Sequence, residues 1–216
     1  MRTFVNLPSV PKRELPPEFR ADDVRQNEAL VELLLREFSQ QGDVVFDPFA
    51  GFGTTLVVAE WLGRVPVGIE FDARRVAYAR SLLQRQESLI EGDSRQLASY
   101  QLPPIDLSLT SPPYKHRQEI EDPLAAYTVP GAGYEQYLLG LQDIYRQIAG
   151  FMKPTAHAIL DVENIKKPYG VTTLAWDIAA AIGEVLHFEG EIVIGKETPS
   201  CGYDHSYCLV FNKSSE

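Results

Sequence analysis

The residues best suited to chemistry form a short string, Ser111-Pro112-Pro113-Tyr114, directly after an apolar stretch that ends at Thr110. The two prolines lack N–H groups and fix their φ angles, which leaves backbone carbonyls free to accept hydrogen bonds. The Ser111 hydroxyl and the Pro112 carbonyl can accept hydrogen bonds from the two N–H groups of an amine, and Tyr114 can stack on an aromatic ring. The string indicates chemistry on the exocyclic amino group of a flipped nucleic-acid base, with a rigid surface turn as the simpler interpretation.

Such an amine is a poor nucleophile because its lone pair is delocalised into the ring. Two acceptors on its two N–H bonds favour a pyramidal nitrogen whose lone pair points elsewhere. That lone pair can then face an electrophilic methyl group for in-line transfer. Positioning supplies much of the rate of such a step, so no covalent enzyme intermediate is needed.

A second string has the composition of a cofactor-binding turn between a strand and a helix. Its glycines let the backbone approach a ligand closely, and the start of the helix offers free N–H groups and a positive dipole end. Leu56 stands where a dinucleotide fingerprint has glycine, and no Walker lysine follows, so nicotinamide and ATP sites are disfavoured. The string is Asp47-Pro48-Phe49-Ala50-Gly51-Phe52-Gly53-Thr54-Thr55.

Acidic residues follow the next two expected strands. Glu70 ends the strand at 65–70, where it is placed to accept hydrogen bonds from a ribose diol. Asp93, followed by Ser94, is placed to accept from an adenine amino group, and Phe71 can pack on the adenine ring. The simpler interpretation is that both acids cap strand ends. We expect a nucleoside-bearing cofactor to contact Asp47, Pro48, Phe49, Gly51, Gly53, Thr54, Thr55, Glu70, Phe71, Asp93 and Ser94.

Strands and helices alternate along the chain, which indicates a parallel sheet covered on both faces. Hydrophobic periodicity predicts helices at 27–38, 54–61, 73–84, 134–148 and 174–182. Strands are expected at 43–47, 65–70, 88–91, 105–110, 156–162, 191–195 and 206–211. The predicted fold class is α/β: a doubly wound, mostly parallel seven-stranded sheet with a C-terminal antiparallel hairpin, in a Rossmann-like arrangement.

The length of 216 residues suits one such domain. Residues 1–25 are rich in proline and charge, so we expect an extended arm there and no packed element. Residues 26–216 would form the single domain, with a long substrate-facing loop at 111–133.

The formal net charge of −10 counts against binding that depends mainly on phosphate contacts. A local basic surface remains compatible with this charge, although lysines and arginines in loops are often merely solvated. The candidates for nucleic-acid contact are Lys115, His116 and Arg117, and also Lys166 and Lys167.

The two cysteines and four histidines show no metal-ligand spacing, so no metal site is expected. The N-terminus lacks the apolar stretch of a signal peptide. No apolar run approaches the ~20 residues needed to span a bilayer. These features predict a cytoplasmic protein that does not enter a membrane.

Together the strings resemble the amino-methyltransferases that modify DNA at cytosine N4 or adenine N6. Asp47 to Thr55 looks like their cofactor motif, Ser111 to Tyr114 like their catalytic motif, and Gly68-Ile69-Glu70 like their acidic strand end. Tyr203 to Phe211 is similar to their final strand. The resemblance covers roughly residues 26–212 and implies S-adenosylmethionine as cofactor. In this family the helix before the first strand often contacts the methionine end of that cofactor, which implies Asn27, at the start of the helix expected at 27–38, as the contact.

The resemblance bears on the target as well. Serine at the first catalytic position goes more often with cytosine N4, and Asp or Asn with adenine N6, so Ser111 favours cytosine. Members that recognise long DNA sites carry a large recognition domain, whereas only the arm and residues 115–133 are unassigned here. A short site, loose specificity or a partner subunit is therefore implied. The cofactor motif precedes the catalytic motif, whereas many cytosine-N4 enzymes have the opposite order.

Two alternatives stay open. RNA guanine-N2 methyltransferases use a Pro-Pro-Tyr-like loop in the same fold, but they usually carry an RNA-binding domain and more often have an acidic residue in place of Ser111. The chain could instead be a non-catalytic partner subunit that binds nucleic acid. The intact cofactor and catalytic strings, which a scaffold does not need, argue against this second alternative. The sequence leaves open whether the protein is paired with a restriction enzyme.

Overall fold

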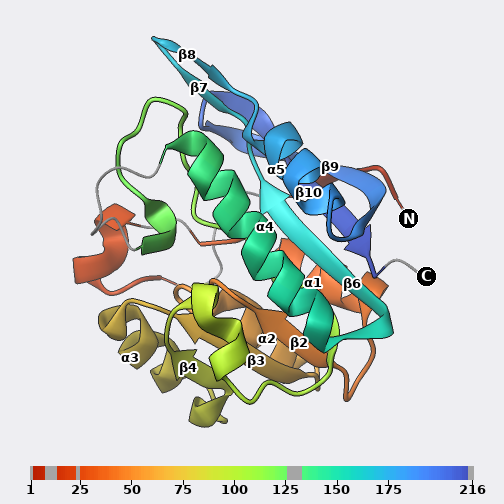
Figure 1. The fold of residues 1–216 in the computed structure, drawn as a ribbon. Helices are drawn as coiled ribbons and strands as arrows, with labels where there is room; N and C mark the ends of the chain where they lie inside the picture. The colour runs from red at the N-terminus through yellow and green to blue at the C-terminus, as the bar shows by residue number, and fades with distance from the viewer. Residues whose placement is uncertain (1, 8–13, 23–24, 126–132, 214–216) are drawn as a thin grey trace.

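The computed structural model describes residues 2–7, 14–22, 25–125 and 133–213. Figure 1 shows a twisted central sheet with helices packed against it. The sheet has eight strands in the order β1-β9-β10-β6-β5-β2-β3-β4. In chain order these strands are β1 (Phe4–Leu7), β2 (Val44–Asp47), β3 (Val65–Glu70), β4 (Leu89–Glu91), β5 (Ile105–Thr110), β6 (Met152–Val162), β9 (His187–Ser200) and β10 (Tyr203–Asn212).

The predicted fold class is confirmed. Neighbouring strands are parallel from β6 through β5, β2 and β3 to β4, and β10 runs antiparallel to both β6 and β9. Chain order runs outward from β2 through β3 and β4 on one side, and through β5 and β6 on the other. The boundary between β2 and β5 is therefore the topological switch point, where ligands bind in open α/β sheets.

The sheet has one strand more than the seven expected. Residues Phe4–Leu7, predicted as part of an unpacked arm, pair in parallel with β9 as β1. The strand β9 spans His187–Ser200 and would otherwise leave a long edge of unpaired N–H and C=O groups. Phe4–Leu7 lies in a stretch rich in proline and charge, which masks a strand in the sequence, so this pairing depends on the exposed edge of β9. Residues 1, 8–13, 23–24 and 126–132, which belong to the predicted arm and loop, lie outside the described part.

Alternate side chains of each strand enter two different hydrophobic clusters. On β10, Leu209 and Phe211 pack in the cluster beneath α4 and α5, while Cys208 and Val210 pack beneath α1 and α2. This alternation is the period of two of a strand buried on both faces. The helices are α1 (Glu28–Phe38), α2 (Thr54–Trp61), α3 (Ala73–Leu82), α4 (Tyr134–Phe151) and α5 (Leu174–Gly183).

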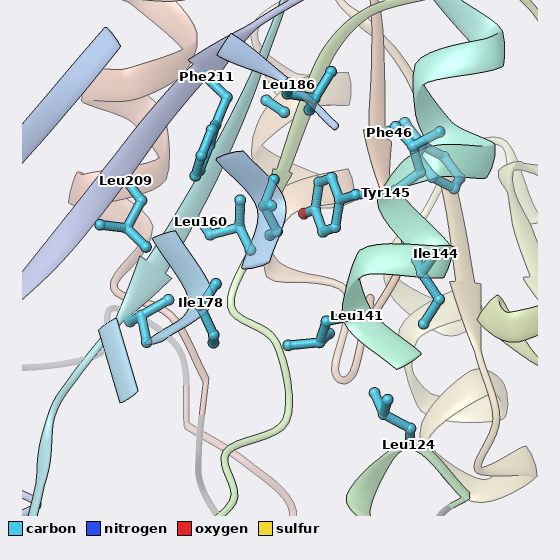
Figure 2. Close-up of a cluster of buried hydrophobic side chains, with 14 of the residues drawn as sticks. Phe46, Leu124, Leu141, Ile144, Tyr145, Leu160, Ile178, Leu186, Leu209 and Phe211 are labelled. Carbon is cyan, nitrogen blue, oxygen red and sulfur yellow. The ribbon is translucent and has the colours of Figure 1, made fainter. Parts of the chain in front are cut away.

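Figure 2 shows the first cluster, in which α4 presents Leu141, Ile144 and Tyr145 to side chains of the sheet and of α5. All three are essentially inaccessible to solvent. The 18-residue helix α4 thereby fixes one face of the strands whose ends carry the two chemical strings.

Short elements complete the structure. A two-stranded ribbon of β7 (Ile165–Lys167) and β8 (Gly170–Thr172) projects from the body beyond β6 (Figure 1). The sequence patterns predicted neither strand. The 3-10 helices are η1 (Pro17–Asp22), η2 (Gln86–Ser88), η3 (Ser94–Ser99) and η4 (Pro123–Ala125). None of the helices in the described residues is both long and apolar enough to cross a membrane.

The core of α4 gives a direct test of this packing. Leu141→Ala removes a fully buried side chain and should lower the free energy of unfolding by about 2–5 kcal/mol, because a cavity replaces lost apolar contacts. Leu139→Ala on the same helix truncates a side chain that is 50% exposed and serves as the matched control. Urea unfolding of both variants would show the difference, and equal losses would contradict the placement of α4.

Candidate active site

A cavity of about 940 Å³ opens at the carboxyl ends of the parallel strands. The cofactor string (Asp47 to Thr55) and the catalytic string (Ser111 to Tyr114) both line this cavity. The rest of its wall comes from the end of β3, the residues after β4 and the ends of β6, β9 and β10. Of the predicted cofactor residues only Gly53 is absent from its wall, and all four residues of the catalytic string are on it. The fold therefore brings together two strings that are about 60 residues apart in sequence.

The two glycines of the cofactor string have different roles. Both have positive φ, 53° at Gly51 and 80° at Gly53. A Cβ on Gly53 would lie 2.9 Å from the Ala79 Cβ, so this glycine permits close packing of α2 on α3. A Cβ on Gly51 would meet nothing nearer than 3.9 Å, and Gly51 lines the cavity. Only Gly51 therefore offers the close approach to a ligand that the sequence predicted for both.

Asp47 joins the two strings. Its Oδ1 accepts a hydrogen bond of 2.6 Å from the Thr110 hydroxyl at the end of β5 and one of 3.0 Å from the Phe49 amide. The carboxyl is only 3% exposed. Burial raises the pKa of Asp47 to about 6, although the Thr110 and Thr55 hydroxyls act in the opposite direction. An ionised Asp47 in this position would be stabilised by a cationic ligand.

Glu70 holds the cofactor turn against the end of β3. Its two carboxylate oxygens accept hydrogen bonds of 2.8 Å from the backbone amides of Gly51 and Asp72. Each oxygen retains a lone pair, so Glu70 can also accept from a ligand in the cavity. The adjacent Phe71 ring is 48% exposed, which leaves a face available for stacking.

The residues after β4 are engaged more closely than the sequence predicted. The Asp93 carboxylate accepts hydrogen bonds from the backbone amide and guanidinium of Arg95 and begins η3. Burial acts to raise the pKa of Asp93, but Arg95 outweighs it and the net pKa is lowered. The Ser94 hydroxyl donates to the Pro48 carbonyl. Both residues still line the cavity, and both also fix the loop that surrounds it.

Asn27 also has a structural role. Its side-chain oxygen accepts from the Ala29 amide at 2.8 Å and caps the N-terminus of α1. Because Asn27 lines the cavity as well, the cap and a ligand contact are compatible. The wall continues at Thr55, whose hydroxyl donates to the Gln26 side chain at 3.1 Å.

In the catalytic string, Pro113 and Tyr114 are held by hydrogen bonds to the rest of the protein, whereas among the described residues the Pro112 carbonyl is free to accept one. The Pro113 carbonyl accepts from Tyr137 on α4 at 2.8 Å. The Tyr114 phenol donates to the Asp161 carbonyl at 3.3 Å and accepts from the Glu163 amide at 3.0 Å. Burial, followed by the nearby charges of Asp161 and Glu163, raises the pKa of Tyr114 well above its usual value. In the described part of the chain no donor contacts the Pro112 carbonyl.

The prediction that Lys115, His116 and Arg117 form a basic surface is wrong for Lys115 and His116. Lys115 is fully buried and its ammonium donates to the Glu121 carbonyl. His116 is 2% exposed, and its ring packs edge-on against Tyr169, with the centroids 5.0 Å apart. The loop folds back on the protein, which the sequence pattern did not reveal. Arg117 remains exposed but pairs with Asp177 at 2.9 Å.

Several residues of the cavity were missed by the sequence patterns. Asp161 lies next to the end of β6 and is 8% exposed, within a stretch from Ala158 to Val162 that is otherwise apolar. A charged residue inside such a run is the signal that could have identified it. The other missed residues with polar side chains in the wall include Gln26, Glu163, Lys196, Ser200 and Ser206. No group of three or more potential metal ligands occurs among the described residues.

Part of this chain is similar in sequence to DNA methylases. The family model for DNA methylases matches residues 19–81, which include the cofactor string and Glu70. The type II methyltransferase M2.DpnII of Streptococcus pneumoniae is 39% identical over 59 residues. That match covers 27% of this chain and 22% of the relative. The catalytic string, Ser111 to Tyr114, lies outside the family match.

Solved structures share the fold at low sequence identity. TrmN from Thermus thermophilus superposes with a TM-score of 0.64 at 20% identity, covering 94% of this chain and 55% of that one. A TehB-like S-adenosylmethionine-dependent methyltransferase from Corynebacterium glutamicum gives 0.59 at 14% identity, covering 91% and 93%. An rRNA methylase from Streptococcus thermophilus gives 0.56 at 9% identity, covering 89% and 99%.

The family match and the fold both support S-adenosylmethionine as the cofactor. The cavity fits such a group because Gly51 presents an open backbone face, Glu70 offers acceptor lone pairs and Asp47 offers a buried carboxyl for a cation. Residues 19–81 of the chain therefore resemble the DNA methylase family, and the whole described fold is similar to that of S-adenosylmethionine-dependent methyltransferases.

Proposed function

We propose that the protein transfers a methyl group from S-adenosylmethionine to an exocyclic amino group of a base in DNA. One observation carries this proposal: the cofactor string and the catalytic string open into a single cavity, linked by the Thr110–Asp47 hydrogen bond. A scaffold subunit would need neither the shared cavity nor the open first half of the catalytic string.

The cavity residues divide between the two ends of the cofactor. Glu70 would accept from the ribose hydroxyls, and the exposed face of Phe71 would stack on the adenine. Asp93 and Ser94 would border the adenine end, while Asn27 and Asp47 would border the methionine end. The α-ammonium group there is the cation that would stabilise an ionised Asp47.

When bound, the cofactor would supply an electrophilic methyl group on a sulfonium sulfur, which keeps the bonding electron pair when the methyl group is transferred. The Ser111 hydroxyl and Pro112 carbonyl would accept the two amine N–H bonds and direct the lone pair towards that carbon. The hydrogen-bonded Tyr114 ring would hold the flipped base by stacking. The methylated nitrogen then sheds one proton to water, and the chain forms no covalent bond to substrate.

Among exocyclic amines we favour cytosine N4 over adenine N6 because a hydroxyl stands at position 111. The chain's match spans about a fifth of M2.DpnII, so recognition of a DNA sequence would depend on few elements here or on a partner subunit. The fold is also similar to that of an rRNA methylase, so RNA is the competing substrate to test.

The ribbon β7–β8 replaces Lys115 and His116 as our candidate for nucleic-acid contact. Lys166, Lys167 and Tyr169 are exposed on it. The Lys166 amide donates to the Cys201 carbonyl at 2.7 Å, which anchors the ribbon beside the β9–β10 turn at the cavity. A projecting ribbon with lysines and an exposed tyrosine can contact phosphates while the base enters the cavity.

The product of methyl transfer tests the proposed function. Tritiated S-adenosylmethionine is incubated with the protein and either mixed DNA or bulk tRNA, and the labelled nucleoside is identified after digestion. We expect N4-methylcytosine or N6-methyladenine from DNA. Tyr114→Ala should lose most of the activity while retaining affinity for S-adenosylhomocysteine, and Tyr114→Phe, which keeps the stacking ring, should lose less. Label found only in tRNA guanine would show that the protein is an RNA guanine methyltransferase. Normal activity of Tyr114→Ala would refute the role of the catalytic string.

The buried carboxyl of Asp47 gives a pH dependence. Its folded-state pKa of about 6 lies above the unfolded value of 3.8, so the folded state holds the proton more tightly. The contribution to stability is present below pH ~4 and is lost as pH rises through about 6. Asp47→Asn mimics the protonated form and should raise the free energy of unfolding of the ligand-free protein at pH 7.5 by up to about 3 kcal/mol.

Asp47→Asn should also weaken the binding of S-adenosylhomocysteine, because a neutral amide cannot form an ion pair with its α-ammonium group. In the unsubstituted protein, affinity measured by calorimetry should fall as pH drops from 8 to 5.5. Glu91→Gln, which changes an exposed carboxyl at the end of β4, is the control for both measurements. An affinity that is independent of pH, or an Asp47→Asn variant that is no more stable, would contradict this account.

The ribbon contact is tested by salt dependence. Replacing Lys166 and Lys167 together by alanine should reduce the slope of log binding constant against log salt concentration by about 1–2 in magnitude. Each phosphate contact contributes about 0.9 to this slope for duplex DNA. Arg85→Ala, an exposed change near η2 at the other end of the sheet, should leave the slope unchanged. The comparison requires fluorescence anisotropy at several salt concentrations, and equal slopes for all proteins would reject the ribbon.

A further inference from the structure

Three buried polar atoms on the cavity wall lack partners in the fold. Asp161 Oδ1, Gln26 Nε2 and Ser206 Oγ are shielded from solvent and complete no hydrogen bond of good geometry with the described residues. All three residues line the cavity that holds the two strings. Native proteins satisfy nearly all buried polar atoms, and each exception costs free energy. These three of six such atoms in the described residues belong to neighbouring side chains, since the Ser206 hydroxyl and the Gln26 amide both act on the Asp161 carboxyl, and together they form a polar patch that faces the cavity.

The position of Asp161 places this group beside the catalytic string. Thr110 on β5 pairs with Leu160 on β6, so the next residues along the two strands are Ser111 and Asp161. The Tyr114 phenol donates to the Asp161 backbone carbonyl. A base whose amine is held by Ser111 and Pro112 would therefore lie next to the Asp161 side chain.

The charges near Asp161 are already committed elsewhere. Lys196 forms an ion pair with Glu163, and the Ser200 hydroxyl contacts both Glu163 oxygens at 3.0 and 2.8 Å. Burial raises the pKa of Asp161, while Lys196, the Ser206 hydroxyl and the Gln26 amide act in the opposite direction. The net pKa of Asp161 is raised, and a carboxyl that holds its proton has one O–H donor beside an acceptor oxygen.

We propose that Asp161, flanked by Gln26 and Ser206, reads the ring edge of the target base by donating to the ring nitrogen next to the exocyclic amine. Cytosine N3 and adenine N1 are acceptors at that place, whereas guanine N1 carries a hydrogen. The wall would accordingly admit cytosine or adenine and reject guanine. This inference rests on the proposed function and names the feature of the base that the site selects.

The test removes the ring acceptor from the substrate. In the DNA identified by the labelled-product assay, the methylated base is replaced by its deaza analogue, 3-deazacytosine or 1-deazaadenine. The protein should prefer the natural base in kcat/KM by at least about tenfold, the worth of one hydrogen bond. Asp161→Ala should lose that preference by acting more slowly on the natural base. Asp161→Asn keeps an N–H donor and should restore much of the preference, which a purely structural role would not require.

Two controls separate recognition from damage to the fold. Asp204→Asn and Asp204→Ala alter a carboxyl that is 77% exposed and should keep the full preference. Melting temperature and S-adenosylhomocysteine affinity should be nearly unchanged in Asp161→Ala.

The outcomes distinguish this inference from the proposed function. Equal rates on natural and deaza bases, or an undiminished preference in Asp161→Ala, would overturn the role of Asp161 while methyl transfer to DNA stands. Methylation of guanine would likewise overturn it and leave a methyltransferase. A protein that binds S-adenosylhomocysteine but labels neither DNA nor tRNA would remove the proposed function and this inference together.

Discussion

The hydrogen bond between Thr110 and Asp47 is the contact on which the site geometry depends. It spans the switch point of the sheet, where β2 and β5 lie side by side and the chain leaves in opposite directions. Each partner stands at the start of one chemical string, so the bond sets the distance between the cofactor turn and the catalytic string. The buried helices α1 and α4 pack on opposite faces of these strands and hold them in place.

The same site contains groups that folding alone does not favour. Asp47 and Asp161 are carboxyls buried at strand ends, and burial raises the pKa of both. Gln26 and Ser206 contribute polar atoms without partners. Desolvating such groups costs stability, and a protein retains them where a ligand recovers the cost. Under the proposed function, Asp47 would meet the cation of the cofactor and Asp161 the edge of the base.

Close packing explains features that ligand binding does not. Gly53 belongs to the cofactor string, yet the Ala79 side chain, and not a ligand, excludes a larger residue there. Asn27, Asp93 and Ser94 each complete a cap or a loop contact while lining the cavity. Residues of this kind position the surrounding loops as well as meeting a ligand, so their substitution would alter shape and affinity together.

The sequence alone determined the α/β class, the order of the elements and the two strings at strand ends, because hydrophobic periodicity and glycine or proline content act over short stretches. It indicated Glu70 and Tyr114 by their places in those strings. Only the tertiary structure decided that Phe4–Leu7 adds an eighth strand, that Lys115 and His116 are buried, and that Asp161 stands beside Ser111. Strand pairing and burial join residues distant in sequence, and no local pattern encodes which edges and side chains will meet.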